Sequence, residues 1–183
     1  MHSLSGHLLV ASPHMKDPSF ARTVTLMLRH EESGALGVVL TQPGNKTVSE
    51  VWELIEAPPV DCHDDVFNGG PVPGPMIALH DSESHSEQEV LPGLHMAMQR
   101  DAIDSLVRSE DSVYRLYSGH AGWGGGQLEE ELQASGWLKT PASINEVFSD
   151  HETLWQRTIS KIGISIAAPN IDPSQVPSDP GLN

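Results

Sequence analysis

The sequence predicts a single domain of the α+β class. Its 183 residues suit one ordinary domain and are too few for two comfortable ones. Three strand-like stretches open the chain and are joined by short turns, which favours an antiparallel start. Helical patterns follow without the regular strand–helix alternation of a doubly wound parallel sheet. We therefore expect the α+β class rather than a parallel α/β fold.

The first three strands are predicted from short apolar runs and from alternation. His7–Ser12 is an apolar run closed by a proline. In Thr23–Leu28 the residues alternate with a period of two, as in a half-buried strand. A third strand, Val38–Leu40, is followed by the turn-forming residues Gln42–Asn45, which we expect to end it.

A capping box predicts the first helix. Thr47 can accept a hydrogen bond from an amide of the first turn, and Glu50 can reach back to the amide of Thr47. Apolar residues then recur at helical spacing, and the pair Pro58-Pro59 is expected to stop the helix. The apolar residues of this face are Val48, Val51, Trp52 and Ile55.

The middle of the chain predicts short strands separated by loops. Apolar or alternating runs are predicted as strands at Asp64–Phe67, Met76–Leu79, Leu94–Met98 and Ser112–Ser118. A short helix is predicted after Asp101, where apolar residues are three and four apart. The polar stretch His80–Gln88 is expected to be an exposed loop.

Two helices are predicted in the C-terminal third. The first covers Gln127–Ala134 and ends before a glycine. The second begins at the capping-box spacing of Ser149 and Glu152, and Gly163 is expected to end it. We assign residues 1–168 to one domain. Residues 169–183 contain four prolines and are expected to be a mobile tail.

The charge balance excludes several classes of partner. Lys and Arg number 10 and Asp and Glu number 25, which gives a formal charge of −15. Nonspecific binding to DNA, RNA or an anionic membrane surface requires the opposite sign. No apolar run approaches the ~20 residues of a spanning helix. We expect neither direct nucleic-acid binding nor membrane insertion.

Cysteine usage and the N-terminal residues indicate a reducing compartment. Cys62 is the single cysteine, so the chain cannot form an internal disulfide. Residues 1–6 contain no Lys or Arg and no long apolar stretch, so they do not have the pattern of a signal peptide. We therefore expect a cytoplasmic protein.

The glycine-rich stretch Gly119–Gly126 lies between a predicted strand and a predicted helix, a context in which backbone amides bind phosphate. No Gly-Lys-Ser/Thr follows, and the glycines lack the dinucleotide-binding spacing. Glu129–Glu131 open the next helix and would repel a phosphate. We interpret the glycines as backbone that needs positive φ or a close approach to Trp123.

Histidines and nucleophiles give weaker signals. The chain has ten histidines, but none has the spacing of a metal site. His80 closes a predicted buried strand and is the best single candidate for a general base, although a hydrogen-bonded structural histidine at a turn is the favoured interpretation. Acidic neighbours argue against a nucleophilic Cys62, and Ser118 lacks the Gly-x-Ser-x-Gly elbow.

Four blocks of sequence resemble the YqgE/AlgH family of bacterial proteins, and the match extends from Gly6 to Gly163. Their order and spacing make the resemblance specific. The blocks are Gly6–Pro13 with Asp17–Val24, His30 with Gly34–Leu40, Gly69–Val72 with Leu79–His80, and Gly119–Glu131 with Trp137–Leu138 and Leu154–Trp155.

The resemblance implies a fold but no chemistry. The family fold is a single α+β domain whose bent, bifurcated, mainly antiparallel sheet curls into a partial barrel with helices packed against it. The function of the family is not established, although some members are labelled transcriptional regulators of exopolysaccharide synthesis. No catalytic residues are agreed for the family, so none are carried over to this chain.

The favoured function is a non-catalytic binding or regulatory module that acts in the cytoplasm through a protein or small-molecule partner. It is favoured because the sequence shows no nucleophile, metal or cofactor motif. We therefore expect no catalytic residue, no metal and no cofactor.

The alternative is an enzyme or a ligand-binding protein. Its pocket would form where the loops Gly69-Gly70-Pro71 and Gly119–Gln127 converge near His80, because loops that follow strands often lie at one end of a sheet. Gln127 and His120 would orient a ligand, and His80 would act as the base. The candidate pocket or motif residues are Gly69, Gly70, Pro71, His80, Gly122, Trp123 and Gln127.

Overall fold

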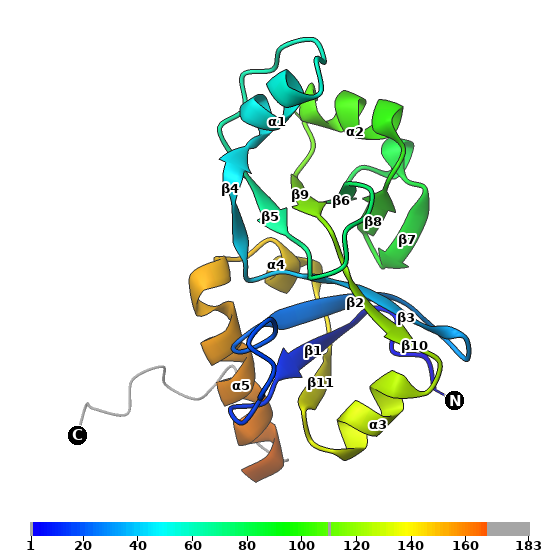
Figure 1. Ribbon diagram of the computed structural model, residues 1–183, viewed down its shortest axis with the longest axis vertical. Coiled ribbons are helices and arrows are strands. Elements are labelled where there is room, and N and C mark those ends of the chain that lie inside the picture. The colour runs from blue at the N-terminus through cyan, green and yellow to red at the C-terminus, as the bar shows by residue number, and fades with distance from the viewer. Residues whose placement is uncertain (1, 110, 168–183) are drawn as a thin grey trace, which may run out of the picture.

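The computed structural model describes residues 2–109 and 111–167 (Figure 1). Over these residues eleven strands form two sheets, accompanied by five α-helices and one 3-10 turn. All neighbouring strands are antiparallel except one parallel pair. The α+β class is confirmed, and neither sheet closes into a barrel within the described residues. The predicted tail, residues 169–183, lies outside the described residues.

The first sheet has five strands. In spatial order they are β10 (Ala121–Gly124), β3 (Gly34–Val39), β2 (Val24–Glu31), β1 (His7–Ala11) and β11 (Trp137–Pro141). The central strand β2 carries an irregularity where its register with β3 shifts between Met27 and Arg29. The edge strands β10 and β11 each pair on one side only with strands of the described chain.

The second sheet has six strands. In spatial order they are β4 (Pro43–Thr47), β5 (Asp65–Asn68), β9 (Tyr114–Ser118), β6 (Ile77–His80), β8 (Leu94–Ala97) and β7 (Gln88–Leu91). The pair β5–β9 is the parallel one. The 3-10 turn η1 (Glu83–His85) lies between β6 and β7 in the chain.

Two chain segments pass from one sheet to the other. One leads from β3 through Leu40–Gln42 into β4, and the other leads from β9 through Gly119 into β10. In Figure 1 the second segment runs down from the upper sheet and across the lower one. These crossings produce the bend and the split that the family resemblance implies.

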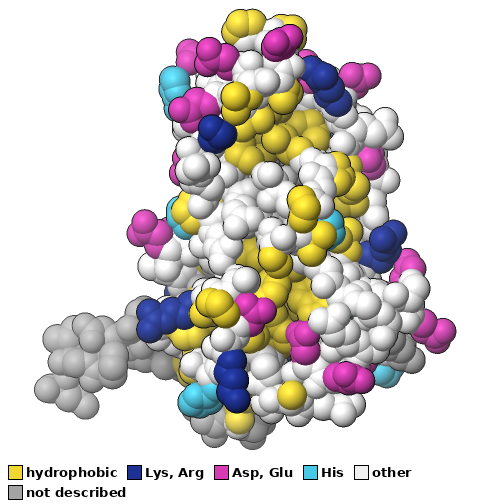
Figure 2. Space-filling view, in the orientation of Figure 1, with side chains coloured by type: hydrophobic (Ala, Val, Ile, Leu, Met, Phe, Trp, Pro, Cys, Tyr) yellow, Lys and Arg dark blue, Asp and Glu magenta, His cyan; other side chains and the backbone are white. Residues whose placement is uncertain are grey.

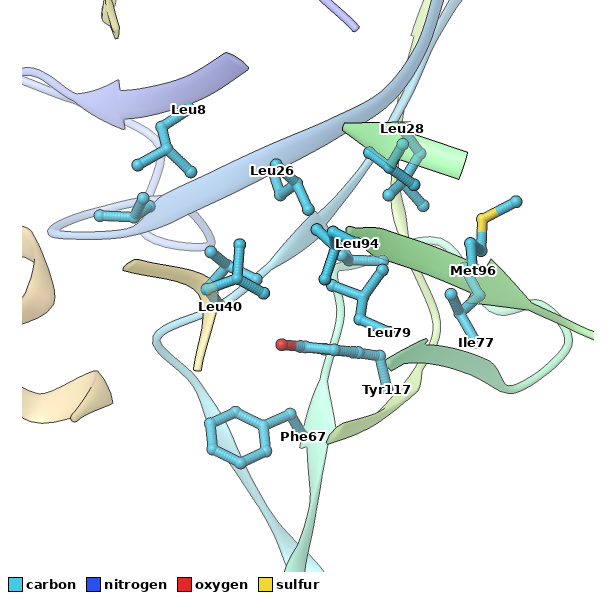
Figure 3. Packing of buried hydrophobic residues seen from close by; sticks show 14 of the residues in the cluster. Leu8, Leu26, Leu28, Leu40, Phe67, Ile77, Leu79, Leu94, Met96 and Tyr117 are labelled. Atoms are coloured by element: carbon cyan, nitrogen blue, oxygen red, sulfur yellow. The ribbon is translucent and has the colours of Figure 1, made fainter. Parts of the chain in front are cut away.

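The main core lies between the two sheets. Buried side chains from β1 and β2 face buried side chains from the second sheet (Figure 3). Each fully buried aliphatic side chain contributes roughly 1.5–3 kcal/mol relative to its exposed state. The cluster therefore fixes the two sheets against each other. Its members include Leu8, Leu26, Leu28, Phe67, Leu79 and Tyr117.

The helices cover the remaining faces. The helices α1 (Val48–Leu54) and α2 (Arg100–Val107) pack on a second cluster with the outer face of the six-stranded sheet. Helix α3 (Gln127–Gln133) packs on the outer face of the first sheet. Helices α4 (Ile144–Val147) and α5 (His151–Ala167) contact the main core.

The capping box predicted for α1 is confirmed. The amide of Thr47 donates a 2.7 Å hydrogen bond to Glu50 Oε2, and the amide of Glu50 donates a 3.3 Å bond to Thr47 Oγ1. The capped helix places Val48 and Trp52 in the cluster under α1 and α2. This element follows from local sequence alone.

Three predicted turns or loops contain strands. The predicted turn Gln42–Asn45 contains the start of β4, and the predicted loop Gly119–Gly126 contains β10. The predicted loop His80–Gln88 includes η1 and the first residue of β7. These segments are polar or rich in glycine, so periodicity gives no signal, and pairing with a neighbouring strand decides their structure.

The last helix begins and ends differently from the prediction. The predicted capping box of Ser149 and Glu152 does not form, since the Glu152 amide donates to Asp150 Oδ1 at 3.1 Å. A capping box forms instead at Ser143 and Glu146, at the start of α4. Helix α5 also continues through Gly163, because one helical glycine costs only about 1 kcal/mol relative to alanine.

Candidate functional site

Two glycine-containing segments meet where the chain passes between the sheets. The amide of Gly69 donates a 2.8 Å hydrogen bond to the Ser118 carbonyl, and Val72 and His120 exchange backbone bonds of 3.0 and 2.9 Å. A Cβ on Gly69 would lie 2.3 Å from the carbonyl oxygen of Gly119. Only glycine allows this approach, so the backbones are in direct contact. We call residues 68–72 with 118–120 the glycine junction.

The glycine junction also binds the other crossing segment. The amide of Val39 donates to the Gly69 carbonyl, and the amide of Asn68 donates to the Gln42 carbonyl, both at 2.8 Å. The Asn68 side chain accepts from the Gly70 amide at 3.2 Å and donates to Gln42 Oε1 at 3.3 Å. The junction is therefore a rigid backbone crossing that holds Asn68 in one orientation.

A groove of about 580 Å³ lies beside the glycine junction. Figure 2 shows apolar side chains gathered below α1 on this face of the molecule. The groove combines an apolar wall with four polar side chains from β4, β5 and β9, namely Asn45, Lys46, Asn68 and Ser118. Its lining includes Lys46, Val51, Val66, Asn68, Met76 and Ser118.

The described lining of the groove contains Ser118 but no histidine, cysteine or carboxylate. Ser118 is the last residue of β9, and its side chain forms no hydrogen bond with a histidine or a carboxylate in the described chain. A nucleophilic serine needs such a base within hydrogen-bond reach. The groove is therefore suited to binding through apolar contact and a few directed hydrogen bonds.

Trp123 and Gln127 belong to a different place, a hydrogen-bonded cluster under α3. Glu131 Oε2 accepts the indole N–H of Trp123 at 3.0 Å and that of Trp137 at 2.8 Å. Gln127 Nε2 donates to Glu131 Oε1 at 2.9 Å, while Gln127 Oε1 accepts from the Gly124 amide at 3.0 Å. We call these residues the Glu131 cluster. In this cluster both the nitrogen and the oxygen of the Gln127 side-chain amide are hydrogen-bonded.

Comparisons with known proteins identify the family. A family model described as AlgH-like matches residues 8–167. The chain belongs to the AlgH-like family. The UPF0301 protein AlgH of Pseudomonas aeruginosa is 40% identical over 172 residues, which cover 90% of this chain and 91% of that protein. A UPF0301 protein of Stenotrophomonas maltophilia is 38% identical, over 90% of this chain and 92% of its own.

Solved structures show the same fold. The solution structure of AlgH from Pseudomonas aeruginosa has a TM-score of 0.71 at 33% identity, and the match covers 98% of this chain and 96% of that one. A crystal structure of a protein from Corynebacterium diphtheriae has a TM-score of 0.68 at 23% identity, with 85% of each chain covered. The latter likeness concerns the fold alone.

His80 is not brought to the glycine junction in this AlgH-like chain. It pairs with Tyr114 at one end of the β6–β9 ladder, whereas Ser118 ends β9 four residues away. At about 3.3 Å per residue the separation along the strand is about 13 Å. The structure thus joins Gly69, Gly70 and Pro71 to Gly119 and His120, but places His80, Trp123 and Gln127 elsewhere.

His80 is buried against a second histidine. Its ring is fully buried and stacks on His95 at a centroid distance of 5.9 Å, and neither ring nitrogen has a hydrogen-bond partner in the described residues. Burial lowers the pKa of His80, and the neighbouring His95 and His85 lower it further. A neutral imidazole carries one N–H, so this donor is desolvated without compensation. His80 is thus a buried histidine at the end of β6, but the hydrogen bond expected for it does not form among the described residues.

The other predicted positions have packing roles. A Cβ on Gly74 would lie 2.8 Å from His120 Nδ1, so the His120 ring packs on the backbone of residue 74. Gly122 lies on β10, and a Cβ there would be 3.7 Å from the same ring. The His120 ring forms no hydrogen bond with any described residue, and it packs against Gly74 and Gly122.

Sequence reasoning did not find the hydrogen bond between His30 and Glu129. The Leu4 amide donates to His30 Nδ1 at 3.1 Å, which leaves Nε2 to donate to Glu129 Oε1 at 3.0 Å. The bond ties α3 to β2 across 99 positions of sequence, so no local signal could have shown it. The His30 side chain is only 3% exposed, which indicates a structural role.

In the described part of the chain no three His, Cys, Asp or Glu side chains are grouped to hold a metal ion. None of the helices in residues 2–109 and 111–167 combines the length and the apolar character needed to span a bilayer.

Proposed function

We propose that this AlgH-like chain is a non-catalytic binding module that acts in the cytoplasm through a protein partner. The groove beside the glycine junction is its binding surface. The observation that carries the proposal is the junction itself, whose direct backbone contact fixes Asn68 and Ser118 at the border of an apolar groove. Rigid backbone and preformed polar groups reduce the entropy lost on binding.

Apolar surface around the groove favours a protein as the partner. Val51 lines the groove, and Leu54 and Ile55 follow it at helical spacings of three and four. Leu54 is 64% exposed and Ile55 46% exposed. Val72, in the glycine junction, is 38% exposed. Exposed large apolar side chains grouped in this way are typical of interaction surfaces.

The charge of the groove argues against nucleic acid as the partner. Lys46 is the one basic side chain among the described groove residues, in a chain of formal charge −15. A single cation releases few counterions from a phosphate backbone and gives little affinity. A partner segment with apolar side chains and a few hydrogen-bonding groups fits the lining better.

Site-directed photo-crosslinking tests the proposal. A photoreactive benzoyl-phenylalanine replaces Met76 in the groove, and in a matched control it replaces Val113, which is 52% exposed at the His80 end of the second sheet. Irradiation in the native cells should yield a discrete protein adduct from position 76 and none from position 113.

Competition gives the second measurement. Excess wild-type protein should suppress the adduct at position 76, whereas a Val51→Glu variant, which places a carboxylate in the apolar wall, should suppress it far less. No adduct from position 76, or the same adducts from both positions, would overturn the proposal.

A further inference from the structure

The edge strand β11 exposes backbone groups that its neighbour does not use. Its register with β1 pairs Leu8 with Thr140 and Val10 with Leu138. The bonds from the Ala142 amide to the Gly6 carbonyl and from the Ser12 amide to the Gly136 carbonyl, both 3.0 Å, show that the even-numbered residues of this segment face β1. In an antiparallel ladder the intervening residues face the other way.

The outward groups therefore belong to Trp137, Lys139 and Pro141. Trp137 and Lys139 each present an amide N–H and a carbonyl, and Pro141 presents a carbonyl only. No described residue forms a hydrogen bond with the amides of Trp137 or Lys139. A row of such groups is a template for another extended chain.

A groove runs along this edge. It has a volume of about 690 Å³, within the range of ligand-sized sites, and β11 lies between its two walls, α3 and α5. Figure 1 shows the lower part of β11 between these two helices. Leu132 of α3 and Ile162 and Ile166 of α5 make the walls apolar.

The charge of this groove is opposite to that of the molecule. Its described lining contains Lys139 and Lys161 and no carboxylate, although Asp and Glu outnumber Lys and Arg by 25 to 10 in the chain. Lys161 bonds to Glu146 at 2.8 Å, whereas Lys139 is exposed and forms no ion pair with any described residue. An acidic side chain of a bound segment could form an ion pair with Lys139.

We infer that β11 is a second docking site, which takes an extended acidic and apolar segment of another protein by strand addition. The segment forms backbone hydrogen bonds with Trp137 and Lys139, places alternate apolar side chains on the walls from α3 and α5, and sets a carboxylate beside Lys139. This inference does not rest on the groove at the glycine junction, which lies on the other sheet.

A second copy of the chain fits the edge poorly. Full antiparallel overlap of two copies of this five-residue strand pairs the central Lys139 with itself. Like charges placed directly opposite each other on paired strands are destabilising. Charge complementarity therefore favours an acidic segment over self-association.

The test uses a displayed library of random twelve-residue peptides selected on the full-length protein. Enriched peptides should carry alternating apolar residues and at least one Asp or Glu. Their Kd is then measured by fluorescence anisotropy against wild type, Lys139→Pro, Lys139→Glu and the control Lys16→Glu, which reverses an exposed lysine outside the groove.

The two variants at position 139 distinguish the contribution of the backbone to peptide binding from that of the side chain. Proline removes an amide that points away from β1, and edge strands tolerate it there. Loss of that hydrogen bond should weaken binding by about three- to tenfold. Lys139→Glu keeps the backbone intact, so it serves even if the proline variant is poorly folded, and it should weaken binding of the acidic peptides by at least as much. Lys16→Glu should leave Kd within about twofold.

Other results would overturn the inference. One is the absence of enriched peptides, and another is a Kd that neither variant at position 139 changes. Binding seen only after removal of residues 168–183 would assign the groove to the chain's own C-terminal segment. A dimer in sedimentation velocity that either variant dissociates would assign it to a second copy.

Discussion

The indole N–H of Trp137 donates a 2.8 Å hydrogen bond to the carboxylate of Glu131, six residues earlier in the chain. The same oxygen accepts the indole of Trp123 at 3.0 Å, and both rings are nearly fully buried. The two rings pack edge to face with centroids 6.1 Å apart. One carboxylate thus holds together α3, β10 and β11, including the edge strand of the inferred docking site.

Glu131→Ala should destabilise the fold strongly. It leaves two buried indole donors without an acceptor, and hydrogen bonds to charged groups contribute about 1.5–3 kcal/mol each, not fully additively. We expect the free energy of unfolding in urea to fall by about 2–4 kcal/mol. Glu131→Gln retains an acceptor oxygen and should cost less. The neighbouring Glu130 is exposed, so Glu130→Ala should change the value by less than about 0.5 kcal/mol. An equal effect of the two alanine variants would contradict the role of the cluster.

His80 should make stability depend on pH. Burial, followed by His95 and His85, lowers its pKa in the folded protein, and the backbone of Ser82 and the Asp81 carboxylate only partly oppose this. The folded state then binds fewer protons than the unfolded chain, so stability is highest above the ordinary pKa of about 6.5 and decreases as the pH falls through that value. His80→Leu removes this contribution and should flatten the decrease between pH 7 and 5. As the pH is lowered, the free energy of unfolding of His80→Leu should therefore rise relative to that of wild type.

The exposed His14 provides the control for the His80 measurement. Its side chain forms no ion pair with any described residue. The free energy of unfolding of His14→Leu, measured in urea at each pH, should follow that of wild type. If His80→Leu also follows it, His80 becomes protonated without penalty in the folded protein, and its environment in solution differs from the one described.

Alanine should have opposite effects on stability at Gly69, in the glycine junction, and at Gly163, in α5. A Cβ at Gly69 meets a carbonyl oxygen at 2.3 Å, and neither backbone can move without breaking the crossing, so Gly69→Ala should cost about 3 kcal/mol or more or prevent folding. Gly163 lies in α5 with open space around its Cβ position, so Gly163→Ala should raise stability by about 0.5–1 kcal/mol. Thermal denaturation of both variants measures the contrast. A tolerated alanine at position 69 would show that the contact is looser than described.

Local signals account for the elements that the sequence predicted well. The Thr47 and Glu50 capping box needs no distant residue, and the stripe of α1 then follows. β10 could not be found in the same way, because Gly122 and Gly124 carry no pattern and become a strand only by pairing with Leu36 and Gly34. The family resemblance supplied what periodicity lacked, namely the bent and split arrangement of strands.

The candidate site was predictable only in part. The convergence of Gly69 with Gly119 was expected from their positions after strands, and the structure joins them. The position of His80 was not predictable, because it depends on which end of β6 faces the junction, and that is set by its register with β9. The role of Gln127 was not predictable for a similar reason. Its hydrogen-bond partners, Gly124 and Glu131, depend on how α3 packs against the first sheet.

Hydrogen exchange can show directly whether the edge of β11 is open. The register implies that the amides of Leu138 and Thr140 are bonded to β1, whereas those of Trp137 and Lys139 point away from it. Exchange of a bonded amide requires local opening, so Leu138 and Thr140 should exchange at least about a hundredfold more slowly than their neighbours once intrinsic rates are corrected. Residue-resolved NMR exchange in the free protein gives this comparison. Equal protection of all four amides would mean that the outer edge is covered in solution, and strand addition would then have to displace whatever covers it.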